Sequence, residues 1–193
     1  KLHDPEDLDV MISELLVATA DGYDRGIDDR VTEVLQLLRR ELGMDVVFVS
    51  EFVGGERVFR FVEGSDANPG LEPGDAGPLE DSYCQRVVQG RMPELVADAR
   101  AIAASHDLPK VDIQVGAHLS TPVTLPDGRV YGTVCCFSAQ ANPNLRQKDL
   151  DRLHQCAKLV ARKISVHKQP PEFQPTAPMW DLVPMESDKY WRL

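Results

Sequence analysis

The sequence predicts an α+β fold in which a central antiparallel sheet of about five to six strands is combined with helices at both ends of the chain. The clearest observation is the stretch from Gly116 to Ser138, where two apolar, β-branched runs flank Pro126-Asp127-Gly128. Such a turn between two such runs is typical of a β-hairpin, because Asp and Gly tolerate the backbone of a tight reversal. The second run, residues 130–137, is almost wholly apolar, which indicates a strand buried on both faces. The order of the elements, with helices first, hairpins in the middle and a helix last, indicates the α+β class.

The first helix is predicted over residues 6–20. Its apolar residues recur at helical spacing and form one stripe: Leu8, Met11, Ile12, Leu15 and Leu16. A second helix follows, with Asp28 or Asp29 as its N-cap and Gly43 as its stop. Its stripe consists of Val31, Val34, Leu35, Leu38 and Leu42. Both helices therefore have one face that must be buried.

The middle of the chain predicts strands and loops. Residues 45–53 and 56–62 read as a hairpin around Gly54-Gly55, and residues 63–79 as a long Gly- and Pro-rich loop. A short helix is expected over 79–90, capped by Asp81 or Ser82, and then a short strand over 95–97. Residues 99–115 predict a helical turn near Ile102 followed by a loop, which leads into the long hairpin.

The last helix is predicted over residues 145–166. Its apolar residues alternate spacings of three and four, as in a heptad seam: Leu150, Leu153, Ala157, Val160 and Ile164. A short seam of this kind indicates a helix partner, which is either this chain's own first helix or the same helix of a second copy. We expect a homodimer that uses this seam.

The C-terminal tail, residues 169–193, differs in composition from the rest of the chain. It holds five of the fourteen prolines, both tryptophans and several other large apolar residues. Flexible spacers contain few aromatic residues. We therefore expect this tail to dock on its own domain or on a partner, while residues 1–168, with a core over 10–166, form a single domain.

The composition narrows the class of function. With 42% hydrophobic and 27% charged residues, the 193-residue chain is ordinary for a soluble globular protein. The net charge of −10, without a basic stripe, argues against nucleic acid or an anionic membrane as a partner. No apolar run is long enough for a transmembrane helix, and the chain opens without a signal peptide. The four cysteines do not form a disulfide framework, so we expect reduced thiols in the cytoplasm.

Several sequence blocks carry a family resemblance over residues 10–166. They are Ser82-Tyr83-Cys84-Gln85-Arg86-Val87-Val88, Val96-Ala97-Asp98-Ala99-Arg100, His118-Leu119-Ser120-Thr121-Pro122-Val123 and, most specifically, residues 127–138 with the sequence DGRVYGTVCCFS. Together they resemble the GAF domains of bacterial signalling proteins. Ser-Thr-Pro-Val stands at 120–123 where Gly-Val-Pro-Leu is commoner, which leaves the fold intact and alters the edge of the pocket.

The resemblance implies a GAF/PAS-like arrangement. The terminal helices would pack on one face of the sheet, and loops and short helices would enclose a ligand pocket on the other. The loop over 63–79 would form part of the pocket rim. A bacterial GAF module of this kind would act on an output domain elsewhere, and the absence of an initiator Met agrees with an excised fragment. The ligand-binding residues that follow are Cys84, Asp98, His118, Ser120, Thr133, Cys135 and Phe137.

The residue types leave alternatives open at each of these positions. Cys84 lies in the first turn of a helix, where a thiol becomes more reactive, yet free cysteines are most often buried in cores. Cys135 and Cys136 are neighbours on a strand and point to opposite faces, so they do not chelate one metal together. We assign Tyr131, Thr133, Cys135 and Phe137 to the pocket face. His118 can hydrogen-bond inside a cavity or serve structurally, and Asp98 can cap the next turn.

We accordingly expect a non-catalytic sensor that binds an unidentified small molecule, with no metal. Ser105 stands where bilin-binding relatives carry their anchoring Cys, which argues against a covalent bilin. The sequence from Ala99 to Gly116 has no Cys, unlike the free-methionine sulfoxide reductases of the family, so enzyme activity is not expected. The alternatives are a ligand-free interaction module and a thiol redox sensor or reductase that uses Cys84 with Cys135 or Cys136.

Overall fold

The computed structural model describes residues 5–20, 22 and 27–168, so the predicted docking of the tail over 169–193 lies outside the described residues. Within these residues a six-stranded antiparallel sheet has the strand order β3-β2-β1-β6-β5-β4. The two predicted hairpins are its centre: β1 (Val46–Val53) with β2 (Glu56–Gly64), and β5 (Ala117–Thr124) with β6 (Val130–Ser138). Strands β1 and β6 pair side by side and join the hairpins into one sheet. The predicted α+β class is confirmed.

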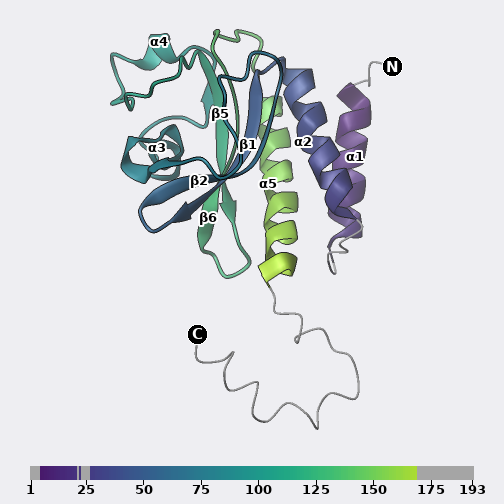
Figure 1. The fold of residues 1–193 in the computed structure, drawn as a ribbon. Coiled ribbons are helices and arrows are strands. Elements are labelled where there is room, and N and C mark those ends of the chain that lie inside the picture. The colour runs from purple at the N-terminus through teal and green to yellow at the C-terminus, as the bar shows by residue number, and fades with distance from the viewer. Residues whose placement is uncertain (1–4, 21, 23–26, 169–193) are drawn as a thin grey trace, which may run out of the picture.

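Three long helices lie on one side of this sheet (Figure 1). They are α1 (Pro5–Ala18), α2 (Asp28–Leu42) and α5 (Gln147–Lys168). Helices α2 and α5 contact the sheet, and α1 packs against both of these helices. The main hydrophobic core forms between these layers and includes Leu15, Leu38 and Leu159.

The helix ends follow the predicted chemistry in part. Gly43 follows α2 with φ of 63°, a left-handed conformation that suits glycine, and its N–H closes the helix on the carbonyl of Arg40. The predicted Asp cap of α2 is wrong, because Ile27 occupies the N-cap position without a side-chain bond, and Asp28 and Asp29 lie in the first turn instead. Acidic groups there still interact favourably with the positive end of the helix dipole.

The other side of the sheet carries short elements and loops. The short elements are the 3-10 turn η2 (Leu79–Asp81), α3 (Tyr83–Val88) and α4 (Ala99–Ile102), and β3 (Ala76–Pro78) and β4 (Leu95–Val96) form the two edges of the sheet itself. The expectation of an uninterrupted loop over 63–79 needs correction, because its last residues pair with the free edge of β2 as β3. Periodicity cannot reveal a three-residue edge strand, because too few residues alternate.

The α5 seam packs inside this chain. Leu150, Leu153, Ala157 and Val160 are buried in the main core, and Ile164 packs against it. The alternation of three and four therefore reflects contact with the chain's own sheet and helices. These side chains are not available as the surface of a dimer seam, which corrects that part of the sequence interpretation.

The alternation of β6 is also broken once. Val123 of β5 pairs with Gly132, but Thr124 pairs with Val130, so Tyr131 is an extra residue on β6. The expected placement of Tyr131 on the same face as Thr133 is therefore wrong, and Tyr131 belongs to the main core on the helix side. Next to it, Gly132 lies so close to β1 that a Cβ would be 1.9 Å from the carbonyl oxygen of Ser50.

Truncation of a seam residue distinguishes an internal role from a role in a dimer. Because Leu153 is fully buried, Leu153→Ala is expected to lower the free energy of unfolding by about 2–5 kcal/mol through lost packing and a cavity. Urea denaturation measures this loss, and light scattering at matched concentration reports the subunit count. Val53→Ala is the control, because Val53 is 45% exposed at the end of β1, outside the helices, and its truncation should change stability little. A Leu153→Ala protein of native stability but with fewer subunits would contradict the internal role.

Candidate functional site

A group of polar side chains is buried on the sheet face opposite the long helices. We call it the buried polar cluster, and it comprises Ser50, Cys84, His118, Ser120, Thr133 and Cys135. All six are at most 3% exposed. Apolar neighbours surround it, among them Phe48, Phe59 and Phe137, whose rings meet edge to face. A polar group in such a setting is costly unless it is hydrogen-bonded, so each partner matters.

Strand pairing explains how the cluster assembles. Ser50 of β1 lies opposite Thr133 of β6, and Cys135 of β6 lies opposite Ser120 of β5. His118 is two residues before Ser120 on the same strand and therefore shares its face. Cys84 comes from α3, which begins directly after Ser82, whose hydroxyl caps the helix by accepting from the Gln85 N–H.

Part of the cluster is internally hydrogen-bonded. The hydroxyls of Ser50 and Thr133 are 2.8 Å apart, and Ser50 Oγ is 3.9 Å from Cys84 Sγ. On the other side, Cys135 Sγ lies 3.2 Å from His118 Nε2. The ring of Tyr83 lies 5.1 Å from the His118 ring, centroid to centroid, and covers it from α3.

Two atoms of the cluster lack a partner. His118 Nδ1 and Ser120 Oγ are buried without a hydrogen bond to any residue that the structure describes. Burial raises the pKa of the nearby Cys135 thiol, and Ser120 Oγ is close enough to that thiol to offset a small part of the rise. Arg57 Nε, on β2 at the same side of the sheet, is also buried without a partner, while its guanidinium lies 4.2 Å from the centre of the Phe59 ring. Each such group costs about 1–3 kcal/mol when it stays unsatisfied.

Burial keeps the cluster uncharged. Desolvation raises the pKa of the Cys84 thiol, and it raises that of Cys135 well above its ordinary value, with the neighbouring Cys84 adding to the effect. Burial also lowers the pKa of His118 to about 4, so the imidazole is neutral at pH 7. Neutral thiols are poor nucleophiles, since the thiolate is the reactive form.

The cysteine behind the cluster faces the helices. Cys136 belongs to the main core, and its pKa is raised by burial and by Cys156 on α5. Burial also raises the pKa of Cys156 to about 12. The two adjacent thiols of β6 thus lie in opposite layers: Cys135 lies in the polar cluster, and Cys136 lies in the core that contains α5.

The remaining predicted site residues have structural roles. Asp98 caps α4, because its Oδ1 accepts from the Arg100 N–H at 3.0 Å, and its side chain is 40% exposed. Phe137 packs against Phe48 in the apolar surroundings of the cluster. The structure therefore brings together five of the seven predicted positions as polar neighbours, with Phe137 beside them and Asp98 at an exposed cap.

Sequence reasoning missed Ser50, Arg57 and Tyr83. Ser50 had a usable signal, because it is a polar residue directly after the apolar run Val46–Val49. Arg57 and Tyr83 had none, since their contacts with Phe59 and His118 depend on how the strands and α3 are placed in space.

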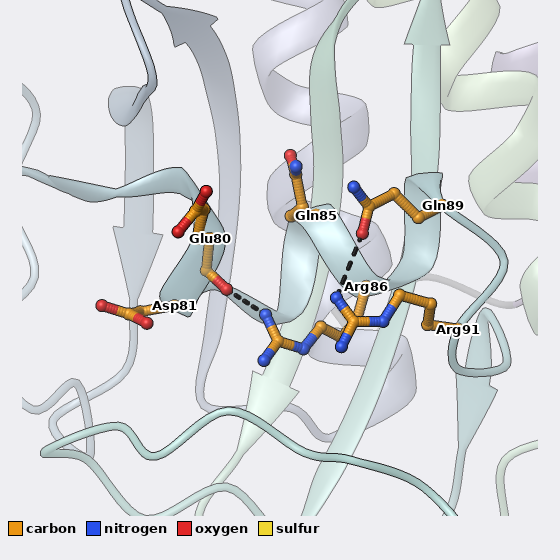
Figure 2. Close-up of a pocket in the computed structure, with 6 residues that line it drawn as sticks. All are labelled: Glu80, Asp81, Gln85, Arg86, Gln89 and Arg91. Carbon is orange, nitrogen blue, oxygen red and sulfur yellow. Dashed lines mark hydrogen bonds between the residues drawn. The ribbon is translucent and has the colours of Figure 1, made fainter.

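An open pocket of about 310 Å³ lies on the outer side of α3, away from the buried polar cluster, and Figure 2 shows its lining. The lining is polar: Glu80, Asp81, Gln85, Arg86, Gln89 and Arg91. Arg86 donates from Nη1 to the carbonyl oxygen of Glu80, and Arg91 donates from Nη1 to Gln89 Oε1 (Figure 2). Its guanidinium groups are thus engaged in holding neighbouring segments.

Two absences bear on the site. Among the residues that the structure describes, no group of three or more His, Cys, Asp or Glu side chains is arranged to hold a metal ion. In the same residues, no helix combines the length and the apolar character that crossing a bilayer requires.

The chain belongs to the GAF domain family, whose profile matches residues 24–165. Several solved structures share the fold. The GAF domain of an Acinetobacter phosphoenolpyruvate-protein phosphotransferase is 14% identical, with a TM-score of 0.57 over 85% of this chain and 98% of that chain. The phycoerythrobilin-bound GAF domain of a cyanobacterial phytochrome is 15% identical, with a TM-score of 0.57 over 86% and 98%.

An enzyme also shares the fold. The free methionine-R-sulfoxide reductase of Neisseria meningitidis, solved with its substrate, is 16% identical, with a TM-score of 0.57 over 82% of this chain and 88% of that chain. Identities this low show a common fold and nothing about ligand or reaction. No curated protein matches the chain.

The neutral His118 predicts a specific pH dependence of stability. The unfolded imidazole has its ordinary pKa of 6.5 and the folded one about 4, so the unfolded chain binds the extra proton in this window. The contribution of His118 to the free energy of unfolding is complete above pH 6.5. It falls as the pH drops, by ~1.4 kcal/mol at pH 5.5.

Urea denaturation of wild type and His118→Gln between pH 7 and 4.5 measures this loss of stability. The variant should lack this component, and His154→Gln should keep it, because His154 is 38% exposed. Equal pH dependence in all three proteins would contradict a buried, neutral His118.

The paired and unpaired hydroxyls predict opposite mutational effects. Ser50→Ala removes the 2.8 Å partner of Thr133 and should cost about 1–2 kcal/mol of unfolding free energy. Ser120→Ala removes a buried hydroxyl that has no partner and should be neutral or stabilising by up to ~1 kcal/mol. Parallel urea titrations compare the two variants. A larger loss for Ser120→Ala than for Ser50→Ala would show that the Ser120 hydroxyl is the better satisfied of the two.

Proposed function

We propose that this GAF domain is a non-catalytic sensory module of a bacterial, cytoplasmic signalling protein, and that it binds a small polar molecule at the buried polar cluster. The observation that carries the proposal is the pair of unpartnered atoms His118 Nδ1 and Ser120 Oγ, which lie two residues apart on one face of β5. A ligand that hydrogen-bonds to both would remove a cost of about 1–3 kcal/mol per atom.

The chemistry of the cluster favours binding over catalysis. Both thiols are neutral and fully covered, and His118 is neutral, so no group of the cluster is poised as a nucleophile. The thiol reductase alternative would need Cys84 or Cys135 to ionise, which burial opposes. The sensor alternative needs only hydrogen-bonding groups in a dry site, and these are present.

Strand β6 offers a route from the site to the helices. Cys135 touches His118 in the cluster, and the next residue, Cys136, lies in the core with α5. A ligand that prefers one packing of β6 would shift the population of helix arrangements, and about 1–3 kcal/mol of coupling is typical for such a response. In this proposal α5 and α1 carry the change to an output domain.

Association of two copies is a further part of the proposal. Because the α5 seam is buried, the contact must use other side chains. Val10 and Val17 lie seven residues apart on α1 and are 54% and 78% exposed, so they present apolar surface on an outer helix. This surface, together with α1's position in the outermost layer, is where the proposal places a second copy.

Ligand binding is tested by native mass spectrometry of the purified protein and by a thermal-shift screen of metabolites and cyclic nucleotides. We expect at least one compound to stabilise the domain. His118→Phe and Ser120→Ala should each weaken the affinity for that compound about tenfold or more, which corresponds to the loss of roughly one hydrogen bond to a buried group. Ser165→Ala is the control, because its hydroxyl bonds within α5 to the Ala161 carbonyl, in a different layer.

The same experiment separates the alternatives. If no compound stabilises the protein and no ligand co-purifies, the ligand-free interaction module replaces the sensor. Treatment with mild peroxide is a separate test of the redox alternative. A change in the free-thiol count or in the oligomeric state would support that alternative. Equal weakening by Ser165→Ala would show that the ligand site lies elsewhere.

A further inference from the structure

The buried polar cluster cannot be reached in the structure as it stands. Cys84 is 1% exposed and Cys135 is fully buried. Two segments cover this side of the sheet together with α3: residues 65–75, which contribute Leu71, and residues 103–116, which contribute Ile113 and Val115. We call residues 103–116 the cover segment. Any molecule that enters the cluster must displace one of these covers.

Residues 65–75 are held by a dense set of hydrogen bonds. The Asn68 side chain accepts from the N–H groups of Gly70 and Leu71 and donates to the Leu71 carbonyl. The Gly74 N–H bonds to the Phe59 carbonyl at 2.7 Å, and the Phe59 N–H returns a bond to Asp75. Opening here would break several of these bonds together, as well as the end of the sheet.

The cover segment is held more sparsely. Toward its N-terminal end, Ser105 and His106 donate to the Ile102 carbonyl, and Leu108 donates to that of His106. At its other end, Gly116 donates to the Ser138 carbonyl and accepts from the Ala99 N–H. Between 109 and 115, the bond that joins the segment to the rest of the described residues comes from a side chain, Gln114 Nε2 to the Ala139 carbonyl. A segment with few bonds opens at lower free energy than the protein as a whole.

One buried side chain fastens the cover segment near its N-terminal end, beside Leu108, which packs against the apolar group around Val87. Arg86 of α3 is 9% exposed and donates from Nε to the Asp107 carbonyl at 3.2 Å. Its Nη1 donates to the Glu80 carbonyl, as Figure 2 shows, so one guanidinium joins the cover segment to the start of α3. Arg91 adds only an ion pair to the Asp107 carboxylate, which is 80% exposed. Exposed pairs of this kind hold weakly, whereas bonds from a buried charged donor hold well.

We propose that the cover segment is a gate over the buried polar cluster and that Arg86 is its latch. Release of the Asp107 carbonyl from Arg86 lets the cover segment swing away while the sheet, α2 and α5 stay folded. The gate gives a ligand of the proposed sensor its entry path, and this purpose rests on the proposed function. The opening motion of the cover segment is a property of the chain alone. It regulates access by the local opening free energy and not by global unfolding.

The four cysteines provide the test, because two lie under the gate and two do not. Cys84 and Cys135 are covered by α3 and the cover segment, whereas Cys136 and Cys156 are buried between the sheet and the helices. Iodoacetamide labelling of the wild-type protein, read for each cysteine by mass spectrometry, is measured over rising urea below the unfolding transition. We expect Cys84 and Cys135 to react faster and almost independently of urea, since local opening exposes little surface. If the labelling rates of all four cysteines rise together with urea, access needs global unfolding and the gate is overturned.

Variants of the latch sharpen the result. Arg86→Gln should accelerate labelling of Cys84 and Cys135 roughly tenfold or more, and leave Cys136 and Cys156 unchanged. The matched control is Arg91→Gln, which removes only the exposed pair and should change the rates less than about threefold. Unchanged rates in Arg86→Gln, or equal acceleration of all four cysteines, would overturn the latch. Arg86→Lys keeps the charge and should be intermediate. The wild-type urea series decides the gate even where a variant folds poorly.

These outcomes are separate from those of the ligand screen. A gate that opens locally in a protein that no compound stabilises would remove the sensor function and leave the gate. A ligand that binds to His118 and Ser120 while all four thiols respond alike would leave the sensor and remove the gate.

Discussion

Burial of β6 on both faces is the constraint on which the rest of the structure depends. The strand pairs with β1 on one side and β5 on the other, so its backbone is satisfied and its side chains have no solvent to face. Alternate residues must then serve two different interiors. Val134 and Cys136 require an apolar helical layer, which α2 and α5 supply. Thr133 and Cys135 require hydrogen-bonding neighbours, which β1, β5 and α3 supply.

The polar side of the sheet is incompletely satisfied, and this distinguishes it from the helical side. Ser50 and Thr133 satisfy each other, and Cys135 meets His118. His118 Nδ1 and Ser120 Oγ remain without partners among the described residues. A protein that only needed a stable core would replace such groups by apolar ones at little cost. These two atoms are the observation on which the proposed binding site rests.

The outer helix is attached by polar contacts as well as by apolar packing. Arg152 of α5 makes a bidentate bond to Asp9 of α1, which lowers the pKa of Asp9, and Arg162 donates to the Leu16 carbonyl and to Thr19. These contacts fix how α1 lies along α5. Because α1 packs mainly on α2 and α5, a change at the cluster would reach it chiefly through these two helices.

The local elements and the burial of β6 on both faces can be derived from the sequence alone. The helix stripes, the turns at Gly54-Gly55 and Pro126-Asp127-Gly128, and the apolar run 130–137 are set by neighbours in the chain, so their periods and turn residues can be read directly. The same alternation predicted that Cys135 and Cys136 face different layers. It failed at Tyr131, where a bulge that depends on the register with β5 turns the side chain to the other face.

Which polar groups meet depends on how the folded chain brings distant elements together. Cys84, His118, Ser50 and Thr133 come from four separate elements, and their contact depends on strand order and on the position of α3. For the same reason the α5 seam was read as a surface for a second copy, although the chain's own core fills it. A stripe of apolar residues records that a face is buried but not by what, because burial energy is non-directional. Hydrogen bonds are directional, and their partners are known only once the chain is folded.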